Sequence, residues 1–171
     1  MPASPAKPRI ALGSDHAGFP IKETIREFLE MAGYPLEDVG TWSEESVDYP
    51  DYGKVVGERV ANHQADYGIA VCGTGIGISI AANKVPKIRA AVAHDVNTAR
   101  LAREHYDANV LAMGGRVVNG KQAIARADVL EHGVSRRPTH AMGGEDQLDR
   151  IGRTAEIVAS ISYFFERRGE R

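Results

Sequence analysis

Short apolar runs alternate with amphipathic segments along most of this chain, and this alternation is the strongest constraint on its fold. Five runs have the length and character of buried strands: residues 9–13, 36–39, 67–72, 88–93 and 109–113. Between and after them, apolar side chains recur at helical spacing, which predicts helices over 21–32, 55–61, 75–84, 96–104 and 122–131. Strands that alternate with helices predict an α/β fold, in which a mostly parallel sheet is covered by helices on both faces.

The two ends of the chain differ from this pattern. Residues 1–8 are rich in Ala, Pro, Ser and Lys and predict a disordered tail, whereas the Gly, Pro and Arg content of 132–144 predicts a loop. Beyond it, Leu148, Ile151, Ala155, Val158 and Phe165 would lie on one face of a long C-terminal helix. The chain has 171 residues and no internal repeat, so we expect one domain over residues 9–171.

Charge and cysteine content narrow the class of protein. The 21 Lys and Arg residues against 23 Asp and Glu residues give a net charge of -2, which argues against a nucleic-acid partner. No apolar run reaches the roughly 18 residues that cross a bilayer, so no membrane partner is expected. The chain start lacks the apolar stretch of a signal peptide. Cys72 is the only cysteine, which excludes an internal disulfide and favours a reducing, cytoplasmic setting.

Polar clusters follow three of the predicted strands, at residues 13–18, 72–77 and 114–116. In a parallel sheet, ligands bind at the carboxyl ends of the strands. One edge of the sheet therefore collects a carboxylate, an imidazole, a thiol, a hydroxyl and a guanidinium, contributed by Asp15, His16, Cys72, Thr74 and Arg116.

The glycine-rich segment after the third strand suits an anion better than a dinucleotide. Its spacing is GxGxG, and Ile78 stands where a dinucleotide fingerprint has its third glycine. No P-loop sequence is present. The backbone amides of such a loop, at the start of a helix, suit a phosphate or an oxyanion that forms during a reaction.

Each candidate residue also has a structural explanation. A thiol beside helix N-terminal amides ionises readily, yet a cysteine at a strand end is commonly a small buried apolar residue. The carboxylate of Asp15 could cap the next helix, and His105 could complement a helix dipole. Arg116 is placed to bind phosphate, whereas Arg136 and Arg137 fit either a surface loop or an anion contact. No metal is expected, because no metal-binding spacing joins the candidate ligands Asp15, His16, His94, Asp95 and His105.

Four segments closely resemble the ribose-5-phosphate isomerase B family, whose relatives act on galactose 6-phosphate, allose 6-phosphate and similar aldose phosphates. They are GSDHAGF (13–19), GTWSEESVDYPDY (40–52), CGTGIGISIAANK (72–84) and ANVLAMGGRVV (108–118). The resemblance implies a Rossmann-like α/β/α sandwich with a five-stranded parallel sheet. It implies aldose–ketose isomerisation without a metal or organic cofactor, in a homodimer or homotetramer whose active site lies between two subunits.

The resemblance also implies roles for individual residues. Cys72 would move a proton between C2 and C1 through a cis-enediol. Asp15 and His105 would open the sugar ring. Thr74 and the amides of Gly73, Gly75 and Gly77 would hold the enediolate oxygen, and His16, Asn109, Arg116 and Arg150 would bind the substrate and its phosphate.

Two departures from the family pattern leave the substrate open. Tyr106 stands where the family usually has asparagine, and Gly143 and Gly144 are followed by Glu145 and Asp146 rather than by the usual arginine. Ribose 5-phosphate is the first expectation. The alternatives are erythrose 4-phosphate, allose 6-phosphate or galactose 6-phosphate, a non-catalytic phosphosugar-binding protein, and, against the glycine spacing, an NAD-dependent dehydrogenase.

Overall fold

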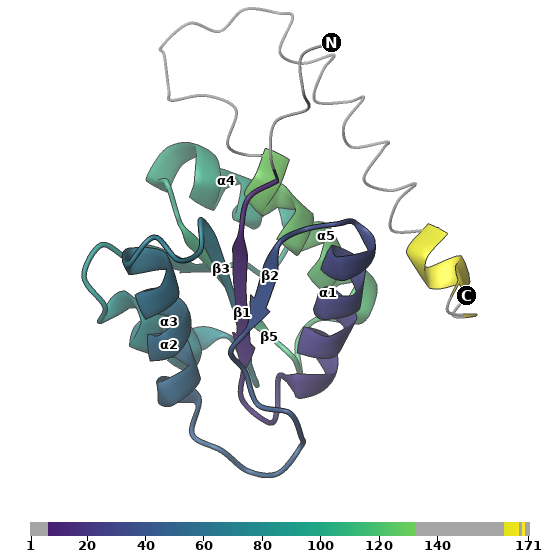
Figure 1. Cartoon of the computed structure of the whole chain (residues 1–171), viewed down its shortest axis with the longest axis horizontal. Coiled ribbons are helices and arrows are strands. Elements are labelled where there is room, and N and C mark those ends of the chain that lie inside the picture. The colour runs from purple at the N-terminus through teal and green to yellow at the C-terminus, as the bar shows by residue number, and fades with distance from the viewer. Residues whose placement is uncertain (1–6, 133–162, 168, 170–171) are drawn as a thin grey trace, which may run out of the picture.

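The computed structural model describes residues 7–132, 163–167 and 169, and the side chains of 130–132 are not described. Ten helices and strands follow one another in this part of the chain (Figure 1). They are β1 (Ile10–Ser14), α1 (Phe19–Met31), β2 (Leu36–Asp38), α2 (Tyr49–Ala61), β3 (Tyr67–Cys72), α3 (Ile76–Asn83), β4 (Ala90–Val92), α4 (Val96–Tyr106), β5 (Val110–Gly114) and α5 (Gly120–His132). Residues 163–167 are also helical.

The five strands form one parallel sheet in the order β2-β1-β3-β5-β4. Ser14 pairs with Val71, and Cys72 pairs with Gly114. The carboxyl ends of β1, β3 and β5 therefore lie side by side at the centre of one sheet edge. This arrangement confirms the predicted α/β fold with a five-stranded parallel sheet.

Helices cover both faces of the sheet (Figure 1). Each face has its own apolar core. On one face, α1 and α5 pack through residues such as Ile25 and Ile124 against Leu12 and Val71. On the other face, α2 and α3 contribute Val56 and Ile78, which pack with Cys72. Because side chains alternate along a strand, Cys72 points to the α2–α3 face while Val71 points to the α1–α5 face.

The predicted element boundaries differ from the structure mainly where helices begin. The helix predicted from residue 55 begins at Tyr49, and the helix predicted from residue 21 begins at Phe19. Both have a proline in the first turn, Pro50 and Pro20. Proline is tolerated there because the first helical N–H groups have no partner inside the helix. Of the predicted C-terminal helix only 163–167 are described, and residues 1–6 of the predicted tail lie outside the described residues.

Candidate active site

Three loops meet over the carboxyl ends of the central strands and are joined by backbone hydrogen bonds. The Asp15 amide, after β1, donates to the carbonyl of Val71 at 3.2 Å. After β5, the amide of Gly115 donates to the Cys72 carbonyl at 2.7 Å, and that of Arg116 donates to the Gly73 carbonyl at 3.1 Å. The loops after β1 and β5 are therefore both fixed to the end of β3.

Two glycines let these loops approach one another closely. A Cβ on Gly18 would lie 2.4 Å from the Val71 carbonyl oxygen, and a Cβ on Gly115 would lie 2.5 Å from the Ala17 carbonyl oxygen. Side chains never come so close to backbone, so only glycine fits at these positions. The centre of the site is therefore built from main chain packed against main chain.

Cys72 is the last residue of β3, and its sulfur faces the start of α3. The residue is 4% exposed, and its Sγ accepts a hydrogen bond from the Gly75 amide at 3.2 Å. Gly75 is the N-cap of α3 and has a φ of 81°, a left-handed conformation that glycine adopts without strain. This backbone conformation turns the loop so that an amide points at the sulfur. The amide donor and the sulfur are therefore held in contact by the backbone of the loop.

The remainder of the glycine-rich loop is more accessible than the sulfur. Thr74 is exposed, Gly73 is half-buried, and the Thr74 Oγ1 accepts the Ile76 amide at 3.3 Å. The ring of Tyr49, in the first turn of α2, packs directly against Gly77. A Cβ on Gly77 would lie 2.6 Å from that ring. The loop thus presents a hydroxyl and backbone at the end of β3, next to Cys72.

Asp15 and His16 lie on the neighbouring loop and are each held by backbone. Asp15 is buried, and its Oδ1 accepts the amide of Gly18, the N-cap of α1, at 2.9 Å. The contact fixes the loop that leads into α1, but the N-cap of that helix is Gly18, so Asp15 is not the helix cap that the structural explanation predicts. The His16 Nδ1 lies 3.1 Å from the Val47 amide nitrogen and 3.2 Å from the Val47 carbonyl oxygen. Sequence reasoning gave Val47 no role, although the segment around it carried part of the family resemblance.

Arg116 places a positive charge beside the glycine-rich loop. Its Nη1 lies 3.4 Å from the position that a Cβ on Gly73 would take. The side chain is exposed, and within the described part of the chain it makes no ion pair or side-chain hydrogen bond. An arginine in this state is available to an anion that binds at the loop.

His105, Tyr106 and Asn109 lie at the opposite edge of the sheet from Cys72. Helix α4 ends at Tyr106, and the chain then enters the amino end of β5, where the Asn109 amide donates to the Arg89 carbonyl at 3.0 Å. The structure therefore does not bring His105 or Asn109 to Cys72 within one chain.

The side chain of Asn109 is also engaged where it stands. Its Oδ1 accepts the Arg89 amide at 2.8 Å and its Nδ2 donates to the Lys87 carbonyl at 3.0 Å. Within one chain Asn109 therefore holds the turn before β4, and its contact with the substrate stays a prediction.

A cavity of about 270 Å³ lies beside the glycine-rich loop, between α2 and α3. Tyr49, Lys54, Gly77 and Ile80 are among its lining residues, and Cys72 is not. The cavity therefore touches the loop at Gly77 without reaching the sulfur.

The residues that the structure describes offer neither a metal site nor a membrane span. Among these residues, no three His, Cys, Asp or Glu side chains gather in a group that could hold a metal ion. No helix in the same part of the chain is both long enough and apolar enough to cross a membrane.

Comparison with known proteins decides the family. The model of the family described as Ribose/Galactose Isomerase matches residues 10–133, which contain every element from β1 to α5. The chain belongs to this family. Ribose-5-phosphate isomerase B of Escherichia coli (strain K12) is 51% identical over 110 residues, which are 64% of this chain and 74% of that protein.

Two other members of the isomerase family indicate how far the similarity extends. Galactose-6-phosphate isomerase subunit LacB of Clostridium acetobutylicum is 48% identical over 108 residues, 63% of this chain and 62% of that subunit. The structure of Clostridium thermocellum ribose-5-phosphate isomerase B is similar with a TM-score of 0.71 and 46% identity, over 88% of this chain and 97% of that one. The family thus includes enzymes named for two different sugar phosphates.

Several residues named in the sequence analysis lie outside the described residues. They are Arg136, Arg137, Gly143, Gly144, Glu145, Asp146 and Arg150. Of the predicted phosphate contacts, the structure describes His16 and Arg116, both on loops that are fixed to the end of β3.

Proposed function

We propose that this member of the isomerase family interconverts D-ribose 5-phosphate and D-ribulose 5-phosphate through a cis-enediol, without a metal or organic cofactor. The observation that carries the proposal is the hydrogen bond from the Gly75 amide to the Cys72 sulfur, on a loop flanked by Asp15 and Arg116. A potential base, oxyanion donors and phosphate ligands are thereby gathered at one edge of the sheet.

In the proposed reaction Cys72 acts as the base. Its thiolate removes the proton from C2 of the open-chain aldose, and the released electron pair forms the C1–C2 double bond while negative charge develops on O1. Thr74 and the amides of the glycine-rich loop stabilise this oxygen. After a proton moves from O2 to O1, the Cys72 thiol returns its proton to C1 and the ketose is complete. Positioned proton transfer contributes roughly 10²–10⁴ to rate, and each oxyanion donor about 10²–10³.

His16 and Arg116 are proposed to bind the phosphate, with Arg150 as a third ligand. A phosphate is far from the reacting carbons, so its binding energy holds the open chain in place rather than acting on the bonds that change. The guanidinium of Arg116 lies beside Gly73 and has no ion-pair partner among the residues that the structure describes, which supports this role.

Ring opening is proposed to need Asp15 and the His105 of a second copy of the chain. His105 lies at the edge of the sheet opposite Cys72, so one chain does not supply both groups to one site. A homodimer or homotetramer with its sites between subunits resolves this separation. Tyr106 is next to His105 and 74% exposed, so it would enter the partner's site together with His105.

A panel of substrates tests the choice of sugar. The purified protein is assayed with ribose 5-phosphate, erythrose 4-phosphate, allose 6-phosphate and galactose 6-phosphate, and we expect the highest kcat/KM with ribose 5-phosphate. The similarity to the galactose-6-phosphate isomerase subunit makes galactose 6-phosphate the main competitor. A clear preference for any other sugar would overturn the assignment to ribose 5-phosphate while leaving the isomerase chemistry intact.

A second candidate, a non-catalytic phosphosugar-binding protein, is favoured by the burial of Cys72, which is also what a small apolar core residue would show. Exchange of the C2 hydrogen in deuterated water separates the two candidates. An isomerase incorporates deuterium into the sugar phosphate, whereas a binding protein holds the sugar phosphate with no exchange above the buffer rate.

A further inference from the structure

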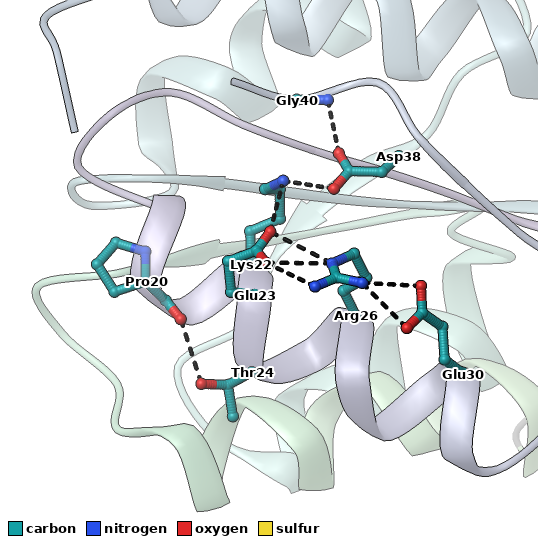
Figure 2. A network of polar contacts seen from close by, with 8 residues as sticks. All are labelled: Pro20, Lys22, Glu23, Thr24, Arg26, Glu30, Asp38 and Gly40. Atoms are coloured by element: carbon teal, nitrogen blue, oxygen red, sulfur yellow. Dashed lines mark hydrogen bonds and ion pairs between the residues drawn. The ribbon is translucent and has the colours of Figure 1, made fainter. Parts of the chain in front are cut away.

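The side chain of Lys22, in the second turn of α1, is completely buried although it carries a charge. Its Nζ forms an ion pair with Asp38, at the end of β2, and lies 2.9 Å from a carboxylate oxygen of Glu23 (Figure 2). The same Nζ lies over the ring of Trp42, 4.5 Å from its centre, and over that of Phe19 at 5.3 Å. Sequence reasoning placed Lys22 among the polar residues between the apolar positions of the helix.

A buried ion pair is weak evidence of a gain in stability, because taking both charges out of water costs about as much as their attraction returns. Well-packed apolar side chains in place of such a pair often give a protein of equal or higher stability. The pair is better explained by the part of the structure that it holds in position.

The pair contacts the start of the chain segment that follows β2, residues 39–48, at Gly40 and Trp42. The second oxygen of Asp38, Oδ1, accepts the Gly40 amide at 2.9 Å (Figure 2). Gly40 packs so tightly between α1 and β1 that a Cβ there would lie 2.8 Å from Lys22 Cδ and 2.6 Å from the Ser14 nitrogen. The Thr41 amide then donates to the Ser14 carbonyl at 3.0 Å, so the segment rests on the residue just before Asp15.

The same segment holds the imidazole of His16. Its residue Val47 offers the Nδ1 of His16 an amide donor at 3.1 Å and a carbonyl acceptor at 3.2 Å. An unprotonated Nδ1 accepts from the amide, whereas a protonated Nδ1 can donate to the carbonyl, so Val47 orients the ring in either state. Apart from this contact and its own backbone bond to Phe19, His16 has no other hydrogen bond among those found in the described residues.

We propose that Lys22 is a positioning residue for His16: through Asp38 and Trp42 it fixes residues 39–48, and Val47 of that segment sets the direction of the imidazole. Lys22 touches no substrate in this arrangement. The proposal rests on the proposed function only for its effect on turnover, because His16 is there a phosphate ligand, and the orientation of His16 can be measured separately.

The first experiment follows His16 directly. In the protein labelled with ¹⁵N-histidine, the His16 imidazole resonances are compared between the wild type, the double variant Lys22→Met with Asp38→Asn, and the control Lys121→Met, an exposed lysine on α5. The double variant removes both charges together and keeps an oxygen for the Gly40 amide. We expect shifted or broadened His16 resonances in the double variant only. Unchanged His16 resonances in a folded double variant would overturn the proposal, whether or not the protein is an isomerase.

The second experiment uses turnover and a double-mutant cycle. The double variant should raise KM for the sugar phosphate about tenfold with little change in kcat, because a misplaced phosphate ligand weakens ground and transition state alike. In the background of His16→Ala the same double variant should cause no further loss, because the effect passes through His16. A further loss of similar size in that background would overturn the proposal for Lys22. A normal KM of His16→Ala itself would instead overturn the phosphate role of His16.

A variant at Trp42 covers the case in which the double variant does not fold. Trp42 is 67% exposed, so Trp42→Leu should leave the core intact while it removes the ring over Lys22. We expect the same direction of change in the His16 resonances, of smaller size. His16 resonances identical to the wild type in Trp42→Leu would then count against the proposal.

Discussion

The Cys72 sulfur receives a hydrogen bond from the amide of Gly75, three residues further along the chain and at the start of α3. The amide and the sulfur are fixed by a single turn of backbone. This relationship fixes the position of the sulfur that is proposed to act as the base, and it makes the most direct prediction about activity.

Cys72→Ser and Cys72→Ala should each lower kcat by at least about 10³-fold with little effect on sugar-phosphate binding. A serine hydroxyl can accept the Gly75 amide but is a far weaker base at neutral pH, and alanine has no base at all. Initial rates and calorimetric binding of the sugar phosphate measure the two effects separately. Turnover of Cys72→Ser within a few-fold of the wild type would remove Cys72 from the mechanism.

Arg116→Ala should raise KM about tenfold or more and weaken inhibition by inorganic phosphate, because the guanidinium beside Gly73 is the proposed phosphate ligand. Arg116→Lys should recover part of the loss, since it restores charge without bidentate geometry. Arg59→Ala is the control, because Arg59 lies in the last turn of α2, away from the glycine-rich loop, and is paired with Glu37 of β2. Equal effects of Arg116→Ala and Arg59→Ala on KM would show that Arg116 does not bind the phosphate.

Mixed oligomers test whether His105 acts across subunits. Cys72→Ser and His105→Ala should each be nearly inactive alone. When they are co-expressed in equal amounts, random pairing puts an intact Cys72 and an intact His105 together in about a quarter of the sites. We expect about that fraction of wild-type activity. If both residues act within one chain, the mixed preparation stays inactive.

Gly75→Ala should destabilise the protein and reduce turnover, because an added Cβ would need a left-handed backbone and would lie 2.8 Å from the Met113 carbonyl carbon. The cost expected in the free energy of unfolding is at least about 1–3 kcal/mol. Gly33→Ala is the control for the backbone conformation alone, because Gly33 has a φ of 76° and open space around it. Urea unfolding of both variants separates crowding from backbone strain. Equal costs would show that Gly75 is not crowded.

Acid should weaken one contact that ties the start of β1 to the start of β3. The hydrogen bonds from Arg9 hold the pKa of Asp66 below its ordinary value, with Arg9 Nη2 2.9 Å from Asp66 Oδ1. A carboxyl with a lowered folded pKa stabilises the fold above its ordinary pKa and loses that contribution as pH falls through the lowered value. Urea unfolding at pH 7 should therefore show Asp66→Asn as slightly less stable than the wild type, and the difference should vanish in strong acid. A difference that is independent of pH would contradict the assignment.

The sequence predicted most of the fold because both helix and strand periods are clear in it. The strands at 9–13 and 67–72 have counterparts in β1 and β3 within one residue at each end. The first turns of α2 were missed because Pro50 and Asp51, both typical of helix starts, break the apolar spacing there.

The site was predictable only in part, because contacts between distant segments have no local signal. The order of strands and polar ends indicated that Asp15, Cys72 and Arg116 would meet. The position of Asn109 just before β5, away from Cys72, was not foreseen, and Lys22 was overlooked because its partner Asp38 comes from another element.

The close packing of Gly18 and Gly115 also bears on how such enzymes diverge. The centre of the site is formed by backbone atoms, which a substitution does not change. A side chain added at Gly18 or Gly115 would collide with neighbouring backbone. Change in the preferred sugar would then come from the periphery, to which the proposed assembly brings the exposed Tyr106 of a second copy. The reaction would thus stay the same among relatives, while substitutions of the surrounding side chains change which sugar is preferred.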